Sequence, residues 1–294
     1  MRVGVGLPTS TPARDRDLVL RWARQADARF SSLGVVDRLV YDCWDPLVSL
    51  AACAAVTERL RLVTMILIGP IRNTTLLAKQ AASVDALSGG RLVLGLGLGA
   101  RQDDYEAAAV DPRHRGTDLT RQLLDMRLQW EEDSVGPRDA QPGAATKSGD
   151  SVGWKPDGPP LLVGGAASAA IARAARYADG YVHGGGPARA FAGAAARVRA
   201  AWIDAGRPGA PELWGQAYFA LGDPATLDRG ATYLRDYYRF TGGFEERIVA
   251  GNLTTPPAVQ DFVRAYEEEG CDELVLLPTV SRLDQLERLA DVLA

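Results

Sequence analysis

Two glycine-rich runs of this sequence have the composition of a phosphate-binding loop. Residues 95–100 (GLGLGA) follow a predicted strand, and residues 163–168 (VGGAAS) follow the next strand and open a predicted helix. Glycines let a ligand approach the backbone closely, and free amides at a helix N-terminus attract an anion. Because the two runs follow adjacent strands, together they are candidates for one phosphate site.

Both runs also have alternative interpretations. Gly95, Gly97 and Ala100 match the GxGxxA fingerprint of dinucleotide-binding folds, but that fingerprint belongs to a first strand–helix unit and needs an acidic residue about 20 positions further on. Here the run follows the fourth predicted strand, and an amphipathic helix occupies the later position. Tight packing of strand against helix explains these glycines as well as a ligand does. In the second run the glycines could simply turn the chain, with Ser168 as the helix cap.

Three titratable side chains stand at the ends of predicted strands. His183 ends the sixth strand and could act as a general acid or base near neutral pH, or it could be a hydrogen-bonded histidine at the rim of the sheet. Asp37 and Arg38 end the second strand as a pair of opposite charge. This pair either takes part in the chemistry or serves as a structural ion pair.

The composition argues against several classes of function. A formal net charge of −4, with basic residues scattered among acidic ones, does not predict a nucleic-acid surface. With two histidines and no CxxC pair among Cys43, Cys53 and Cys271, neither a metal site nor a disulfide framework is expected. No GxSxG, HExxH or P-loop lysine motif supports hydrolase or kinase chemistry. The longest apolar run, 62–71, is shorter than the ~20 residues of a membrane helix, and the first residues lack a signal-peptide core, so we expect a cytoplasmic protein.

The elements that must position these residues alternate along the chain. Short apolar runs predict strands, and longer amphipathic segments predict helices between them. The predicted strands are 3–7, 33–36, 62–66, 92–96, 161–163, 180–183, 213–221 and 273–277. The predicted helices are 15–28, 45–56, 74–87, 118–132, 168–177, 187–205, 225–239, 256–269 and 284–293. Residues 136–158, rich in Gly, Pro, Ser and Asp, are expected to form a variable surface excursion after strand four, with an active-site lid as one role.

This alternation predicts the fold class. Strands that are apolar on both faces and separated by helices indicate a parallel sheet covered by helices. Such a sheet can be open or closed, and eight units in 294 residues favour a closed (β/α)8 barrel, with residues 1–294 as one domain. Catalytic residues of such barrels lie on loops at the C-terminal ends of the strands. The two glycine runs, the Asp37–Arg38 pair and His183 all stand at such ends.

A long stretch of the sequence resembles a known family. Residues 62–92, LVTMILIGPIRNTTLLAKQAASVDALSGGRL, look like the signature of the luciferase-like flavin-dependent oxidoreductases, and the block 77–92 is the most specific part. The family also includes reductases and dehydrogenases that use the deazaflavin coenzyme F420. The resemblance covers essentially the whole chain, since the pattern continues at 95–99, 103–106, 159–165 and 174–180.

The resemblance implies where a cofactor binds. It places the isoalloxazine ring across the barrel mouth, in front of a non-proline cis peptide bond at Met65-Ile66. The family's phosphate contacts carry over to the two glycine runs, at Gly97, Leu98, Gly99, Gly164, Gly165 and Ala166. Many monooxygenases of the family have a histidine one residue after the acidic residue that ends strand two, and this sequence has Arg38 there. Arginine stays charged near neutral pH, so Arg38, oriented by Asp37, would hold an anionic substrate or stabilise a reduced flavin.

The resemblance also implies a reaction class, oxidoreduction of a small organic substrate. With reduced FMN and oxygen the reaction would be a monooxygenation, and a separate flavin reductase would supply the cofactor because no NAD(P)H site is visible. With coenzyme F420 it would be hydride transfer by a reductase or dehydrogenase. A third alternative is a flavin-binding barrel without catalysis. We further expect a homo-oligomer.

Overall fold

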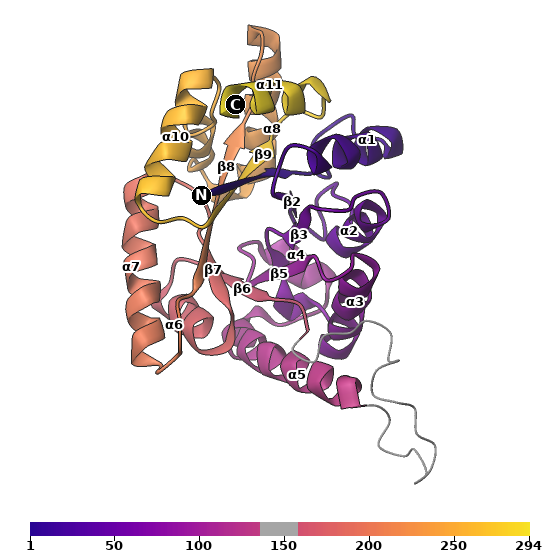
Figure 1. Cartoon of the computed structure of the whole chain (residues 1–294), viewed down its shortest axis with the longest axis vertical. Coiled ribbons are helices and arrows are strands. Elements are labelled where there is room, and N and C mark those ends of the chain that lie inside the picture. The colour runs from indigo at the N-terminus through magenta and orange to yellow at the C-terminus, as the bar shows by residue number, and fades with distance from the viewer. Residues whose placement is uncertain (136–157) are drawn as a thin grey trace.

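The computed structural model describes residues 1–135 and 158–294, and its parallel strands form a closed barrel (Figure 1). The sheet runs in the order β3-β2-β1-β9-β8-β7-β6-β5, and pairing of Leu62 with Leu92 between β3 and β5 closes it. The short β4 continues the third strand and also pairs with β5. The predicted (β/α)8 class is confirmed. The strands are β1 (Arg2–Gly6), β2 (Ser32–Val35), β3 (Arg61–Thr64), β4 (Leu67–Ile68), β5 (Leu92–Gly97), β6 (Leu161–Gly164), β7 (Gly180–Val182), β8 (Glu212–Phe219) and β9 (Glu273–Pro278).

Helices surround the barrel, with α1, α2 and α3 along one side and α7 and α10 along the other (Figure 1). Several begin where a polar side chain accepts a hydrogen bond from a free backbone amide of the first turn, as Asp15 does from Leu18 at 2.7 Å. The helices are α1 (Arg16–Asp27), α2 (Pro46–Ala54), α3 (Thr74–Leu87), α4 (Gln102–Ala107), α5 (Arg115–Val135), α6 (Ser168–Tyr177), α7 (Ala188–Asp204), α8 (Pro224–Tyr238), α9 (Glu245–Ala250), α10 (Pro256–Glu268) and α11 (Asp284–Leu293). Among the described helices, none combines the length and apolarity needed to cross a membrane.

The hydrophobic core lies in two layers because each strand is apolar on both faces. The inner layer fills the barrel, and the outer layer packs the strands against the helices. Burying one such side chain stabilises the fold by roughly 1.5–3 kcal/mol. The inner layer contains Val36, Val63, Met65, Val93, Leu162, Val182, Trp214, Val275 and Leu277.

The structure differs from the sequence expectations in the length of some elements and in two helices that were not expected. The third strand ends at Thr64 instead of residue 66, because the Thr64 hydroxyl exchanges hydrogen bonds of 2.8 Å with the amide and carbonyl of Gly95. The short helices α4 and α9 were not predicted, since one or two turns carry little periodicity. The predicted excursion at 136–158 lies, apart from Gly158, outside the described residues.

The N-terminal end of the barrel is closed by charged residues that each open a strand. Glu273, fully buried, lies 3.0 Å from Arg2 and 3.3 Å from Arg61, and it accepts a hydrogen bond of 2.7 Å from Ser31. Glu212 accepts hydrogen bonds of 2.6 Å from both Arg2 and Arg61. Each carboxylate is therefore shared between two guanidinium groups. We call these four charged residues the basal network.

Candidate functional site

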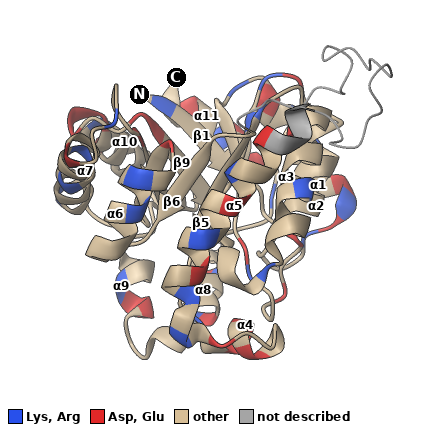
Figure 2. Ribbon diagram, turned by 90° about the horizontal axis from the view of Figure 1, so that it is seen from below, with Lys and Arg blue, Asp and Glu red and all other residues tan. Residues whose placement is uncertain are grey.

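A cavity of about 180 Å³ lies at the C-terminal end of the strands. In Figure 2 this end of the barrel carries α4, α8 and α9, opposite the end where the N-terminus lies. It is the end at which (β/α)8 enzymes carry their active sites. The lining residues are Val36, Asp37, Arg38, Met65, Ile66, Ile68, Gly99, Ala100, Arg101, Asp104, Gln216, Tyr218, Tyr237, Tyr238 and Phe240.

Two walls of different chemistry face each other across this cavity. Met65, Ile66 and Ile68, from the third strand and its extension, form an aliphatic wall. Tyr218 from β8, with Tyr237, Tyr238 and Phe240 from α8 and the turn after it, forms an aromatic wall. The strands β3 and β8 are four places apart in the ring in either direction, so the two walls stand on opposite sides of the barrel. A planar ligand between them would contact both.

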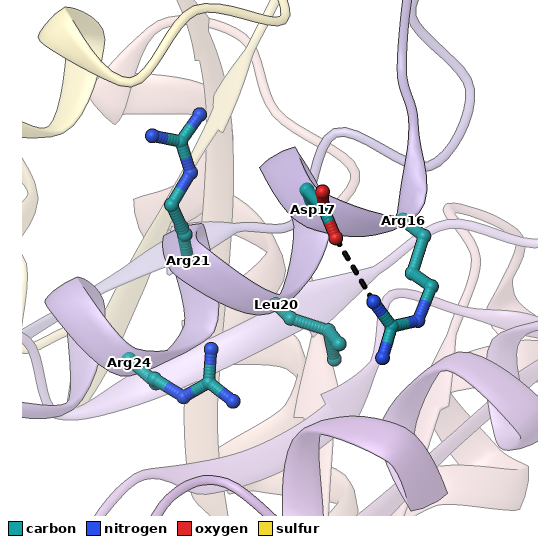
Figure 3. A pocket seen from close by; sticks show the side chains of 5 residues that line it. All are labelled: Arg16, Asp17, Leu20, Arg21 and Arg24. Carbon is teal, nitrogen blue, oxygen red and sulfur yellow. Dashed lines mark hydrogen bonds and ion pairs between the residues drawn. The ribbon is translucent and has the colours of Figure 1, made fainter.

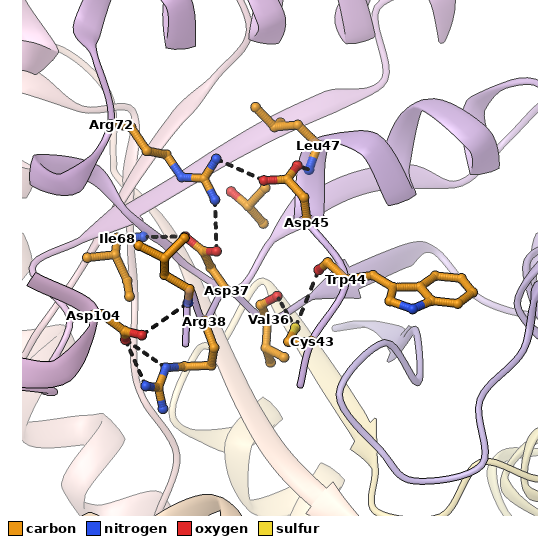
Figure 4. Close-up of polar contacts among 12 residues, drawn as sticks. Val36, Asp37, Arg38, Cys43, Trp44, Asp45, Leu47, Ile68, Arg72 and Asp104 are labelled. Atoms are coloured by element: carbon orange, nitrogen blue, oxygen red, sulfur yellow. Dashed lines mark hydrogen bonds and ion pairs between the residues drawn. The ribbon is translucent and has the colours of Figure 1, made fainter. Parts of the chain in front are cut away.

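Asp37 and Arg38 both line the cavity, but they do not form an ion pair with each other. Arg38 lies 2.8 Å from the carboxylate of Asp104 in α4 and donates to it through Nε at 2.9 Å (Figure 4). Asp37 accepts hydrogen bonds of 2.8 Å from Arg72 and 2.9 Å from the amide of Ile68. The expectation that Asp37 orients Arg38 is therefore wrong, because partners distant in sequence lie closer to each charge.

The Arg38–Asp104 pair clamps α4 to the loop after β2. The fully buried Asp104 also accepts hydrogen bonds from the backbone amides of Leu39 and Val40, at 3.1 and 3.0 Å. These contacts neutralise most of the charge that Arg38 could present to a ligand, and they support the structural interpretation of Arg38. Burial raises the pKa of Asp37 above its ordinary value, although the adjacent Arg72 favours its ionised form.

The Met65–Ile66 peptide bond is cis, as the family resemblance implies. It lies between β3 and β4, where the chain passes the barrel mouth, and both side chains line the cavity. The position of the bond confirms the prediction about the backbone, while its role behind a cofactor ring stays a prediction.

Ile66 explains the absence of side chains at two of the predicted cofactor-binding glycines. A Cβ atom at Gly97 would lie 2.3 Å from the end of the Ile66 side chain, and one at Gly164 would lie 2.5 Å from it. A side chain at either glycine would displace the end of Ile66, which lies between two strands, so the contact differs from the packing of strand against helix that was the alternative for the first run. Gly99 is in the left-handed region at φ 68° and borders the cavity.

The start of α6 presents free backbone amides beside the second glycine run. No side chain of the described residues caps this ten-residue helix, and its N-cap is Ala167. One interpretation of the sequence made Ser168 the helix cap, and this is wrong. Ser168 is the first helical residue, and its hydroxyl accepts a hydrogen bond of 2.9 Å from Arg197 in α7. Gly165 and Ala166 are exposed immediately before it. The arrangement fits an acceptor such as phosphate.

His183 lies at the end of β7 but is not among the residues that line the cavity. Its ring packs edge-on against Phe191, with centroids 5.9 Å apart, and its Nδ1 has no hydrogen-bond partner among the described residues. Burial lowers the pKa of His183, so the imidazole is neutral at neutral pH. The structure therefore does not bring His183 together with Asp37 and Arg38.

Sequence reasoning missed the aromatic wall and Arg101. The Arg101 guanidinium lies 4.3 Å above the ring of Phe240 and 5.4 Å from that of Tyr237, and it donates a hydrogen bond to the Tyr237 carbonyl. The consecutive tyrosines at the end of the predicted helix 225–239 were a detectable signal. Nothing in the sequence indicates that the end of α8 turns toward the barrel mouth.

A second hollow lies away from this end of the barrel, on the exposed face of α1 (Figure 3). It is lined by Arg16, Asp17, Leu20, Arg21 and Arg24. The arginine side chains point in different directions, and Arg16 is bonded to its neighbour Asp17 at 2.9 Å. They do not converge on a common point, so we assign no site to this hollow.

Comparison with known families decides the relationship of this chain. The family model described as luciferase-like monooxygenase matches residues 1–270. The chain belongs to this family. Among curated relatives, an uncharacterised protein of Mycobacterium bovis is 37% identical over 142 residues, and one of Mycobacterium tuberculosis is 36% identical over 165 residues. The first match covers 47% of this chain and 49% of the relative, and the second covers 53% and 54%. This luciferase-like chain therefore spans about half the length of the curated relatives it matches.

Solved structures share the fold over nearly the whole chain. A monooxygenase from Streptomyces bottropensis has a TM-score of 0.74 at 20% identity, covering 99% of this chain and 97% of its own. A coenzyme F420-dependent secondary alcohol dehydrogenase has a TM-score of 0.76 at 16% identity, with the same coverage. The oxygenating constituent of 3,6-diketocamphane monooxygenase from Pseudomonas putida, in complex with FMN, has a TM-score of 0.74 at 16% identity, covering 100% and 98%. At these identities the likeness concerns the fold alone.

Proposed function

We propose that this luciferase-like protein is a monooxygenase that uses reduced FMN and oxygen on a small organic substrate. The observation that carries the proposal is the cavity at the C-terminal end of the barrel, between an aliphatic wall that includes the cis Met65–Ile66 bond and an aromatic wall from β8 and α8. The family membership and the FMN complex of a structural relative support it.

The described residues fit a flavin in two respects. The aliphatic wall of Met65, Ile66 and Ile68 offers an apolar surface to one face of a planar ring. The uncapped amides at the start of α6, beside Gly165 and Ala166, offer donors to a phosphate. The cavity of about 180 Å³ is smaller than the roughly 300–1,000 Å³ of typical ligand pockets. We therefore infer that the phosphate is held outside it, since Gly164, Gly165 and Ala166 are not among its lining residues.

When bound, reduced FMN supplies the electrons with which oxygen is activated. The residues of this chain would bind and orient the ring, and the two walls would exclude water from its reacting face. Asp37 and Arg38 were predicted to be catalytic, and we now propose that they position the loop after β2, since Arg72 and Asp104 hold them. His183 would act as a neutral hydrogen-bonding group at the rim.

Coenzyme F420 is the second candidate cofactor, because one structural relative, which covers 99% of this chain, is an F420-dependent secondary alcohol dehydrogenase. The reaction would then be hydride transfer to or from the substrate. A flavin-binding barrel without catalysis is the third possibility. We also propose a separate flavin reductase as partner in the FMN case, and a homo-oligomeric assembly.

Titration of the purified protein with FMN, with anaerobically reduced FMN and with coenzyme F420 tests the proposal. We expect reduced FMN to bind and to be reoxidised by oxygen at a rate that the protein changes. Binding of F420 without binding of reduced FMN would favour the dehydrogenase. Binding of flavin with an unchanged reoxidation rate would favour the barrel without catalysis, and binding of neither cofactor would overturn the proposal.

A further inference from the structure

Two tyrosine hydroxyls meet inside the cavity, one from each element of the aromatic wall. Tyr218 projects from β8 and Tyr238 from the end of α8, and their hydroxyl oxygens lie 2.7 Å apart. Both side chains line the cavity and are partly exposed. Two further tyrosines of the cluster have hydroxyls that bond elsewhere, since Tyr41 donates to Asp236 and Tyr233 bonds to Ser10.

Counting hydrogens shows that this pair has one to spare. Burial raises the pKa of both phenols, so each keeps its hydrogen near neutral pH. One hydrogen lies between the two oxygens, and among the described residues no acceptor takes the other. Because both side chains border the cavity, a ligand atom that accepts a hydrogen bond can take this hydrogen.

The surroundings of the pair limit the kind of ligand. The rings of Tyr218 and Tyr238 meet edge-on at 5.9 Å, and the ring of Phe240 stacks on that of Tyr238 at 6.2 Å. Aromatic rings favour a flat, apolar partner with some polarisable character. Of the two arginines that line the cavity, Arg38 is paired with Asp104, and the guanidinium of Arg101 packs over the ring of Phe240 and lies 3.9 Å from Asp103.

We propose that the Tyr218–Tyr238 pair binds the substrate by donating a hydrogen bond to an oxygen acceptor on an aromatic ring system, as in an aryl ketone or quinone. The inference rests on the proposed function, since it assigns the substrate side of the same cavity. With a cofactor ring against Met65 and Ile66, the pair would hold the substrate oxygen on the opposite wall. Tyr218 and Tyr238 would thus select substrates that are both aromatic and oxygenated.

The test compares two ligands that differ by one oxygen. 1-Indanone has a carbonyl acceptor and no donor, and indane has the same bicyclic frame without the oxygen. Their dissociation constants are measured on the protein with and without FMN, and the infrared carbonyl stretch of bound, 13C-labelled 1-indanone is recorded. A hydrogen bond from the pair lowers that stretching frequency.

Three variants are compared with the unmodified protein. The double variant Tyr218→Phe/Tyr238→Phe removes both hydroxyls and is decisive, because in either single variant the remaining hydroxyl can donate to the ligand. Tyr41→Phe is the matched control, since it removes a hydroxyl from the same aromatic cluster but outside the cavity. Circular dichroism and the melting temperature verify that each variant is folded.

We expect the double variant to weaken 1-indanone binding about tenfold, corresponding to about 1.4 kcal/mol, and to raise the carbonyl frequency, while indane binding is not weakened. Tyr41→Phe should leave both ligands unchanged. Equal weakening of both ligands, or an unchanged carbonyl frequency, would overturn the inference. If the tyrosine effect is found but neither FMN nor F420 binds, the proposed function fails and the ligand site stands. If a cofactor binds and the effect is absent, only the inference fails.

Discussion

The two ends of the barrel use charged and polar residues in opposite ways. At the N-terminal end, the four side chains of the basal network neutralise one another within 3.3 Å. At the C-terminal end, considering only the described residues, the Tyr218–Tyr238 pair has a spare hydrogen, the Nδ1 of His183 lacks a partner and the start of α6 has no side-chain cap.

This difference separates residues that hold the fold from residues available to a ligand. Unsatisfied groups cost folding free energy, and at the C-terminal end a ligand can offset that cost. One charged pair at the C-terminal end is an exception: Arg38 and Asp104 are both buried and are bonded to each other. Asp37 and Arg38, the charged residues selected from the sequence, are each held in an ion pair, as the residues of the basal network are. Across the outer helices, acidic and basic segments are interspersed (Figure 2).

The largest effect is expected at the base. Replacing Glu273 with Ala removes a fully buried carboxylate and leaves Arg2 and Arg61 to share Glu212, so we expect a loss of about 3 kcal/mol, the lower end for a broken buried ion pair. Urea denaturation should show this loss in the free energy of unfolding, whereas cofactor affinity of the remaining folded protein should be unchanged. A loss of cofactor affinity at full stability would contradict the division between the two ends.

Arg38→Ala tests whether the clamp belongs with the base. If Arg38 takes part in the chemistry, one of the two interpretations that the sequence leaves open, the variant loses turnover or substrate affinity at an unchanged melting temperature. The structure favours the other interpretation, because the variant leaves the buried carboxylate of Asp104 with only two backbone amides. We expect a loss of about 2–3 kcal/mol in unfolding free energy, near the lower end for a broken buried pair. A normal melting temperature with impaired kinetics would restore the catalytic interpretation.

Ala166→Glu tests the free amides at the start of α6. Ala166 is exposed, so a carboxylate there should repel a phosphate without disturbing the core. Flavin or F420 affinity should fall about ten- to a hundredfold, or about 1.4–2.8 kcal/mol. Ala166→Gln has nearly the same size without the charge and serves as the control. We prefer these variants to a bulky residue at Gly165, because φ there is 134° and a Cβ would lie 2.9 Å from that of Ala170. Equal cofactor affinity of the two variants would show that the cofactor phosphate does not bind at the start of α6.

The smallest effect concerns the pH dependence of stability at the rim. Burial lowers the folded-state pKa of His183 below 6.5, so the unfolded chain binds more protons at slightly acidic pH. The contribution of His183 to stability is therefore fully present above pH 6.5 and is lost as the pH falls through its folded-state pKa. Chemical denaturation between pH 7.5 and about 5 should show a shallower decline for His183→Gln than for the unmodified protein. Parallel curves would mean that the imidazole is not held neutral.

Local sequence patterns were sufficient for most elements of the barrel. The strand expected at 92–96 and the helices expected at 74–87 and 168–177 lie within one residue of their observed bounds. They could be predicted because apolar periodicity and end signals, such as Asn73 before α3, act over a few residues. The third strand was predicted too long because its end depends on Gly95, 31 residues away.

The sequence by itself determined the family, the closed parallel barrel and the end of it at which Asp37, Arg38 and the glycine runs would lie. Only the tertiary structure decided the partners, giving Asp104 to Arg38 and Arg72 to Asp37, and the meeting of Tyr218 with Tyr238. It also showed that Gly97 and Gly164 make room for Ile66. The physical reason is one of range. A strand or helix is specified by its own neighbouring residues, whereas a hydrogen bond between side chains far apart in sequence depends on how the elements pack.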